Sequence, residues 1–439
     1  MADRQLPNIV YIHAHDAGRF IGPYGFAVET PNLSRFARSG VLFRKAFSAA
    51  PTCTPSRVGM LTGQPPHECG VFGLTGQGWL IDDYDKHLVR VLNDLGYETA
   101  LAGCQHEALR PDLSPLRYQR LLDDVETGEF YPTSVIHAEE YIAEKARERA
   151  RGVATPFFLS FGTDEPHRNN FARESLGIGG ESARFSKTRY YDPDMLDWRY
   201  TAPLPFLPDL PEIRKDVESL AEGARIMDEY MGRVLAAVDQ HGLGEETLVI
   251  VTTDHGIEFP GGKKTLSEWG TGVMLLMRLP GRFPAGEVVE PIVSQLDVVP
   301  TILDLIGDSP RPWHRGRSLL PLIAGEVESV HEAIFTEQTY HGSLEPLRCV
   351  RTERYKLIRR HFPDGPRMRQ DGPATEVVEP FGWYDQDRGE EELYDLYLDP
   401  MEACNRADDP AYAGIASELR RTLEGWMAET GDRKSTRLN

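Results

Sequence analysis

The sequence is poor in cysteine, in positive charge and in long apolar segments. Five cysteines lie scattered through 439 residues without paired spacing, which argues against a disulfide scaffold and suits a reducing compartment. Acidic residues outnumber basic ones by 68 to 48, and the resulting net charge of -20 disfavours binding to nucleic acid or to an anionic membrane surface. There is no signal-peptide core and no apolar run long enough to span a bilayer. We therefore expect a cytoplasmic protein without nucleic-acid or membrane partners.

The length and the pattern of apolar runs predict two domains, because single cores stop growing at roughly 250 to 300 residues. Through residues 1–329, short apolar runs alternate with amphipathic stretches, which predicts an α/β catalytic domain with a largely parallel sheet. Residues 330–432 contain hairpin-like runs and a last helical stretch, which predicts a small α+β domain with an antiparallel sheet. The basic end, 433–439, is predicted to be a disordered tail. The sequence does not define the oligomeric state.

Four apolar runs read as buried strands, at Asn8–His13, Thr99–Gly103, Pro156–Phe161 and Thr247–Thr253. Polar and ionisable residues follow each of them. Since the carboxyl ends of parallel strands meet along one edge of a sheet, these residues should converge there. The groups are His15 and Asp16, then Gln105, His106 and Glu107, then Asp164 to Arg168, and finally Asp254 and His255.

A metal site is the simplest explanation for such a gathering of acids and imidazoles. Taken alone, each Asp-His pair is more often a solvated loop or a helix cap. Together, however, several such groups would repel or desolvate one another unless a cation lay between them.

The segment that begins at Cys53, CTPSRVGMLTG, adds a possible reactive group. Thr54 is predicted to cap a helix with Pro55 at its first position, which would place Cys53 just before a helix N-terminus. On chemistry alone Cys53 is either an activated thiol or a buried structural cysteine, and the second is the commoner case.

This Cys-x-Pro-x-Arg segment, followed by Leu-Thr-Gly, resembles the maturation signature of type I sulfatases. The resemblance extends through PNIVYIHAHD, TTDHG and ELYDLYLDPMEACN, and so covers nearly the whole chain. It implies an alkaline-phosphatase-like fold, in which a large, mostly parallel mixed sheet lies between helices. It also implies that a formylglycine-generating enzyme oxidises Cys53 to Cα-formylglycine. The segments EPHR, GIEFPGGKKTL and YTAPLPFLP are most similar to heparan N-sulfatases and their bacterial relatives.

By position, the resemblance implies one divalent metal ion held by Asp16, His15, Asp254, His255 and the converted Cys53. His15 and His255 stand where most sulfatases have Asp and Asn. Oxygen ligands favour the Ca²⁺ of the family, whereas two imidazoles favour Mn²⁺ or Zn²⁺.

The remaining site residues fall into catalytic and substrate-binding groups. Arg57 and Lys263 are expected to compensate negative charge, and His106 or His167 to protonate the leaving group. The expected substrate-binding residues are Gln105, which stands at a frequent lysine position, Asp164, Arg168 and Lys264, which is the alternative to Lys263.

The implied reaction is hydrolysis of a sulfate ester or sulfamate on a small sulfated substrate, with an N-sulfoglucosamine-type sugar as the first expectation. One alternative is a phosphonate, phosphate monoester or diester hydrolase of the same superfamily. The Asp254-His255 pair favours this alternative, because it resembles the metal pair of those enzymes. A catalytically silent metal-binding homologue, in which Cys53 stays a thiol, is the other.

Overall fold

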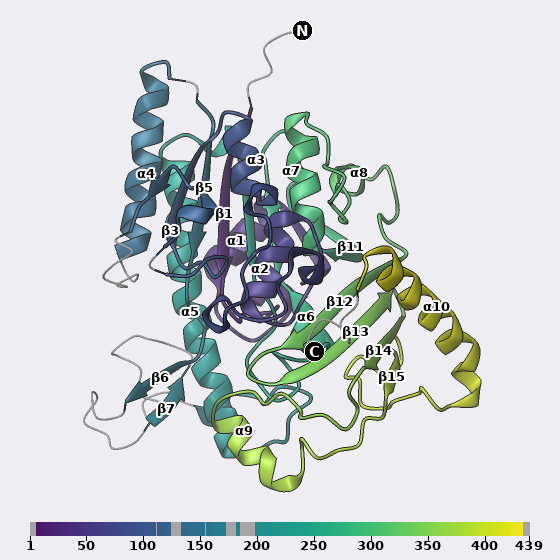
Figure 1. Ribbon diagram of the computed structural model, residues 1–439. Helices are drawn as coiled ribbons and strands as arrows, with labels where there is room; N and C mark the ends of the chain where they lie inside the picture. Colours follow the sequence, from purple (N-terminus) through teal and green to yellow (C-terminus); the bar gives the residue numbers. More distant parts are fainter. Residues whose placement is uncertain are drawn as a thin grey trace.

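The computed structural model describes residues 6–110, 112–123, 133–153, 155–172, 181–184 and 198–432 (Figure 1). The predicted tail, 433–439, lies outside this part of the chain. Among the described residues a nine-stranded sheet has the order β11-β2-β10-β8-β1-β5-β3-β4, with β9 paired to β2. The strands of this sheet are β1 (Asn8–Ala14), β2 (Val41–Phe47), β3 (Glu98–Gly103), β4 (Arg120–Leu121), β5 (Phe157–Gly162), β8 (Thr247–Thr253), β9 (Gly272–Val273), β10 (Leu275–Arg278) and β11 (Glu287–Ser294).

The four strands predicted from the apolar runs lie side by side at the centre of this sheet. They follow the order β8-β1-β5-β3 and are all parallel, and each lies within one residue of its predicted bounds. Their carboxyl ends therefore share one edge. The predicted α/β fold, with a mostly parallel mixed sheet, is confirmed.

The antiparallel strand β10 makes the sheet mixed. It pairs antiparallel with both β8 and β2, while β2 and β11 are parallel. These outer strands escaped prediction because β10 has four residues and the apolar run of β2 is interrupted by Arg44 and Lys45, which are only partly buried.

Helices cover both faces of the sheet, and the side chains of β1 alternate between them. Val10 and Ile12 face one core together with α1 (Pro31–Ser39), α4 (Thr133–Ala150) and α5 (Pro211–Gln240). Ile9 and Tyr11 face the other core with α2 (Cys53–Thr62), α3 (Leu88–Asp94), α7 (Val298–Ile306) and α8 (Leu320–Ile323). This alternation is the period of two expected of a strand buried on both sides.

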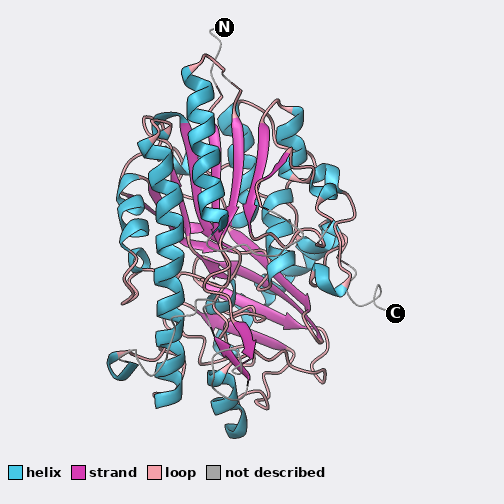
Figure 2. Ribbon diagram, turned by 90° about the vertical axis from the view of Figure 1, so that its left-hand side faces the viewer, coloured by secondary structure: helices cyan, strands magenta, loops and turns pink. Residues whose placement is uncertain are grey.

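A second, antiparallel sheet lies beside the first (Figure 2). It has the order β12-β13-β14-β15, formed by Ala333–Tyr340, Leu344–Thr352, Tyr355–Arg360 and Glu391–Asp395. One face packs on α10 (Ala413–Glu429), and the other contacts Leu266 from the chain that follows β8. The predicted hairpin and last helix are both present.

The remaining strands and α-helices of the described structure are short. A hairpin of β6 (Asn169–Ala172) and β7 (Glu181–Arg184) follows β5, α6 (Glu268–Thr271) follows β8, and α9 (Pro373–Val378) follows β14. None of the helices in the described part of the chain has the length and apolar character needed to cross a bilayer.

Candidate active site

The residues that follow the four central strands meet at one edge of the sheet, where a cavity of about 820 Å³ opens. Cys53, His106, His167 and Lys263 line it. Asp16 and Asp254 lie fully buried beside them, at 0% and 1% exposure. The convergence predicted from the strand pattern therefore exists in three dimensions.

Cys53 is the first residue of α2. The prediction that Thr54 caps this helix is wrong: the N-cap residue is Thr52, whose backbone is extended with φ -144° and ψ 151°. The helix starts two residues earlier than the Thr-Pro signal suggested, because the Ser56 N–H already bonds to the Thr52 carbonyl at 3.0 Å. The Thr54 hydroxyl accepts a hydrogen bond from the Thr75 N–H, 3.2 Å away. Cys53 thus lies in the first helical turn, near backbone N–H groups that have no partner within the helix.

Five buried residues form a compact set of metal donors. One donor atom each of His15, Asp16, Cys53, Asp254 and His255 lies within 4.8 Å of all the others. His15 Nδ1 is 2.7 Å from Asp16 Oδ1 and 3.3 Å from Asp254 Oδ2, while His255 Nε2 is 3.2 Å from Asp16 Oδ1. Two carboxylates and two imidazoles directed at one point suit a divalent cation.

The protonation states of this set agree with metal binding. Burial lowers the pKa of His15 and of His255, so both imidazoles are neutral, which is the form that binds a metal. Burial alone would raise the pKa of Asp16, but the charge and hydrogen bond of Lys263 hold it well below its usual range. Asp254 behaves in the same way through the charge of Arg57. Both carboxyl groups are therefore ionised.

Two buried cations flank the donor set. Arg57 Nη2 is 3.0 Å from Asp254 Oδ2 and donates also to the Ala14 carbonyl at 3.1 Å. Lys263 Nζ is 2.8 Å from Asp16 Oδ2 and reaches the cavity. Burial alone would lower the pKa of Lys263, but Asp16, Cys53 and Glu258 raise it well above its usual value, so the lysine stays charged.

Two histidines stand beside His15. His106 Nδ1 lies 3.1 Å from His15 Nε2, and the centroid of the His167 ring lies 4.2 Å from that of His15. Burial and the charge of Arg57 lower the pKa of His106 to about 3. His167 is the more open of the two and has Nε2 3.9 Å from Asp16 Oδ2. Both line the cavity, as the sequence predicted.

The two consecutive lysines separate. Lys263 lines the cavity beside Cys53, whereas Lys264 lines a different pocket. Lys264 has a φ of 71°, and this left-handed backbone turns the two side chains apart. The structure therefore favours Lys263 over Lys264 as the cation of the site.

The other expected substrate-binding residues line the cavity, and Arg168 and Gln105 bond to other parts of the protein. Arg168 forms a bidentate ion pair with Asp216, at 2.7 and 2.6 Å. Gln105 accepts hydrogen bonds from the backbone N–H groups of Glu107 and Ala108. Both side chains are held by the protein itself and shape the cavity wall, while Asp164 lies on the wall and is partly buried.

Sequence reasoning missed several cavity residues, among them Glu258, His341, Asp371 and Arg110. Glu258 is 2% exposed and bridges the lysines, with Oε2 2.7 Å from Lys263 Nζ and Oε1 3.0 Å from Lys264 Nζ. His341 and Asp371 enter the wall from the chain after β12. Glu258 could have been predicted, because it is an acid five residues before a pair of lysines. No sequence pattern near His341 or Asp371 indicates that they line this cavity.

Comparison with known proteins gives matches over almost the whole chain. A family model described as Sulfatase matches residues 7–308, and one described as N-sulphoglucosamine sulphohydrolase, C-terminal, matches residues 262–365. N-sulphoglucosamine sulphohydrolase of Homo sapiens is 30% identical over 97% of this chain and 90% of its own length. An ulvan-active sulfatase of Formosa agariphila is 24% identical over 98% of this chain and 76% of its own.

Solved structures are similar in fold. One, described as a complex with its substrate D-glucosamine-2-N,6-O-disulfate, has a TM-score of 0.70 and 20% identity, and the match covers 98% of this chain and 99% of that one. A phosphonate monoester hydrolase from Silicibacter pomeroyi has a TM-score of 0.68 and 21% identity, with coverage of 98% and 97%.

Proposed function

Because this chain belongs to the sulfatase family and is a hydrolase of that class, we propose that its substrate is a sulfated sugar of the N-sulfoglucosamine type. The observation that carries the proposal is that Cys53 and Lys263 line one cavity and that two carboxylates, two imidazoles and the Arg57 guanidinium lie buried beside them. The similarity to N-sulphoglucosamine sulphohydrolase along 97% of the chain supports the choice of sugar.

We propose that Cys53 is converted to formylglycine by a formylglycine-generating enzyme. When hydrated, this group supplies a hydroxyl nucleophile for attack on sulfur. In the unmodified protein, burial raises the pKa of the Cys53 thiol well above its usual value, so the cysteine itself is a poor nucleophile at neutral pH. The proposed conversion supplies the nucleophile that the thiol does not provide.

His15, Asp16, Asp254 and His255 would hold one divalent metal ion next to residue 53. Such an ion supplies Lewis-acid stabilisation of the sulfuryl oxygens. Calcium is the ion that family resemblance suggests, and the two neutral imidazoles support Mn²⁺ or Zn²⁺.

Side chains of the protein itself supply the remaining functions, which are charge compensation and proton donation. Arg57 and Lys263 are fixed by buried carboxylates and bring positive charge to the reacting group without rearrangement. His167 is partly exposed at the cavity and is placed to give a proton to the departing oxygen or nitrogen. His106, whose pKa is lowered to about 3, is neutral at neutral pH and contacts His15 instead.

We also propose that residues 1–329 form the catalytic domain and residues 330–432 a smaller domain that helps to close the site. His341 and Asp371, from the second part, line the cavity and support this assignment. A cytoplasmic location is supported by the cysteines, all five of which are unpaired.

The decisive experiment measures the modification and the reaction on the same preparation. The protein is produced together with a formylglycine-generating enzyme, and the peptide that contains Cys53 is analysed by mass spectrometry. Release of sulfate from N-sulfoglucosamine and from an aryl sulfate is then compared with hydrolysis of a phosphonate monoester and a phosphodiester. Cys404→Ala serves as the matched control, because Cys404 is exposed and does not line the cavity.

We expect an aldehyde mass at position 53 and sulfate release that Cys53→Ala abolishes and Cys404→Ala retains. Sulfate release from the aryl ester but not from N-sulfoglucosamine would refute the proposed sugar while leaving the sulfatase activity. An unmodified thiol, with phosphonate or phosphodiester turnover that survives Cys53→Ser, would refute the formylglycine mechanism.

A further inference from the structure

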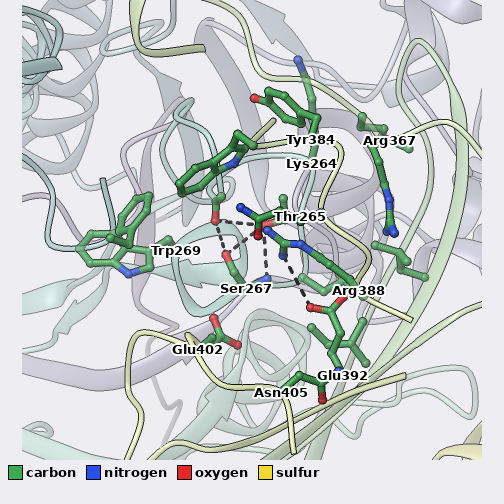
Figure 3. A pocket seen from close by; sticks show the side chains of 18 of the residues that line it. Lys264, Thr265, Ser267, Trp269, Arg367, Tyr384, Arg388, Glu392, Glu402 and Asn405 are labelled. Atoms are coloured by element: carbon green, nitrogen blue, oxygen red, sulfur yellow. Dashed lines mark hydrogen bonds and ion pairs between the residues drawn. The ribbon is translucent and has the colours of Figure 1, made fainter. Parts of the chain in front are cut away.

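A second pocket of about 520 Å³ lies between the chain after β8 and one face of the four-stranded sheet (Figure 3). It shares no lining residue with the active-site cavity. One wall comes from residues 261–269 together with Pro205 and Phe206, and the other from β13, β14, β15 and the segments around residues 367–388 and 401–405. The proposed reaction makes no use of it.

Aromatic rings supply much of the apolar surface of this pocket. Trp269 and Phe206 lie with ring centroids 4.7 Å apart, and Trp383 and Tyr384 lie on the wall formed by later residues. Both tryptophans are only partly buried, so ring surface is open to a ligand. Partly open aromatic faces provide flat apolar contacts for the C–H groups of a sugar ring.

Three arginines on the second wall outnumber the carboxylates that pair with them. Arg360 forms ion pairs with Glu345 and Glu392. Arg367 Nη1 is 3.5 Å from Glu345, and Arg388 Nη1 is 3.6 Å from Glu392, distances at which the charges attract without a good hydrogen bond. The arginine cluster, which we define as these five residues, has three basic and two acidic members, while Lys264, Asp387 and Glu402 are the other charged residues of the pocket lining.

Two guanidinium nitrogens of the cluster lack a hydrogen-bond partner among the described residues. They are Arg360 Nε and Arg367 Nη1, and both are buried. The Arg360 side chain is only 5% exposed, so bulk water does not satisfy its Nε. Burial and neighbouring Arg360 also lower the pKa of Arg367, as expected for an incompletely compensated cation. Buried N–H groups of this kind require an acceptor.

We propose that this pocket is a second carbohydrate site, which binds a pyranose ring that carries one carboxylate or sulfate group. The anionic group accepts from Arg360 and Arg367, the ring packs against Trp269 or Trp383, and its hydroxyls bond to polar wall residues such as Asn405 and Thr265. Figure 3 shows Arg367 and Arg388 around the same pocket as Trp269 and Tyr384. The inference is independent of the proposed reaction, because no active-site residue takes part in it.

Calorimetric titration of the metal-loaded Cys53→Ala protein tests this site, because that variant does not turn substrate over. The probes are methyl β-glucuronide, methyl 6-O-sulfoglucoside and the neutral methyl glucoside. Each is repeated with Arg367→Gln, which removes the charge and retains donors, and with Trp383→Ala and Trp383→Phe. Far-ultraviolet circular dichroism and the thermal midpoint show whether each variant is folded.

We expect at least one anionic probe to bind with a Kd at least tenfold lower than that of methyl glucoside. Arg367→Gln should weaken that binding about tenfold or more, because a charged group contributes roughly a factor of ten or more through its hydrogen bonds. Trp383→Ala should weaken it too, and Trp383→Phe should restore most of it. The glucuronide and the sulfate ester distinguish the two possible anionic groups.

Two results would overturn the inference. One is equal binding of the neutral and anionic probes, or no binding of any. The other is binding that Arg367→Gln leaves unchanged but Lys263→Met abolishes, since it would then belong to the active-site cavity. Arg367→Gln in the Cys53-containing enzyme should leave hydrolysis of a small aryl sulfate unchanged, so a failure of this site and a failure of the proposed reaction are separable.

Discussion

Replacing Glu258 by glutamine tests whether the carboxylate between the two lysines positions Lys263. Glu258 is 2% exposed, and its two oxygens lie 2.7 Å from Lys263 Nζ and 3.0 Å from Lys264 Nζ. Glutamine keeps the shape but removes the charge. Because Glu258 is not among the metal donors, the metal content of the variant should stay that of the wild type.

The structure sets the size of the expected loss. Removing one partner of a buried ion pair costs about 3 to 5 kcal/mol. Lys263 retains Asp16 at 2.8 Å and Lys264 retains Asp371 at 3.3 Å, so the lower limit, about 3 kcal/mol of folding free energy, applies. A lysine displaced by about 1 Å from the reacting group should lower kcat/KM by about 100-fold.

The pH dependence of stability has a defined sign. Burial raises the pKa of Glu258, but Lys263 and Lys264 more than offset this and hold it well below its usual range. A carboxyl group with a depressed folded pKa adds stability above its unfolded pKa of about 4.3, and this stability is lost as the pH falls further. The stability difference between wild type and Glu258→Gln should therefore be full at pH 7 and shrink below about pH 4.

The assay combines steady-state hydrolysis of an aryl sulfate with thermal unfolding at several pH values. Glu290→Gln is the matched control, because the Glu290 side chain is 67% exposed and its contact with Arg44 is 3.9 Å long. A Glu258→Gln enzyme with wild-type kcat/KM would refute the positioning role. A stability difference that does not change with pH would refute the assigned charge.

Three further changes probe the scaffold and the metal site. Asp216→Asn leaves the buried guanidinium of Arg168 without its bidentate partner, so thermal unfolding should show a loss of about 3 to 5 kcal/mol, and a loss under 1 kcal/mol would contradict the ion pair. Although burial lowers the pKa of His67, Glu337 raises it above its ordinary value. This pair therefore stabilises the fold fully below about pH 6.5, and the stabilisation is lost as the pH rises. His67→Gln should flatten that decline in the free energy of unfolding, and an unchanged slope would contradict the prediction. His255→Asn replaces an imidazole by an amide oxygen and should move metal preference from Zn²⁺ towards Ca²⁺ in competition binding, and an unchanged preference would remove His255 from the ligand set.

The sequence predicted the centre of the fold well because its strands are buried on both sides. Runs such as Thr247–Thr253 are continuous and apolar, and they lie beside one another as parallel strands. The outer strands were harder to find, because β2 contains charged residues and the short β10 depends on its neighbours. The hydrophobic periodicity of a sequence indicates which side chains are buried. The outer strands β2 and β10 form because they pair with neighbouring strands, and periodicity does not indicate such pairing.

The candidate site was predictable to the extent that its residues directly follow strands. His15, Asp16, Asp254 and His255 do so, and they lie together. The start of α2 was placed wrongly because the Ser56 N–H already bonds to the Thr52 carbonyl, a contact that local sequence does not reveal. His341 joins the cavity only through the packing of the two sheets, and no local pattern encodes such a contact.

The burial of Cys53 has a consequence for the timing of protein synthesis. The residue is 3% exposed in the folded chain and lies 3.4 Å from His255, which follows β8, a strand that begins only at Thr247. At a synthesis rate of about 5 to 20 residues per second, the roughly 200 intervening residues take about 10 to 40 seconds to emerge. Until β8 emerges, β1 lacks this neighbouring strand, and under the proposed conversion Cys53 is then accessible to the modifying enzyme. If Cys53 is converted as proposed, modification and closure of the fold have competing rates, and a chain that folds faster than it is modified would be stable but permanently inactive.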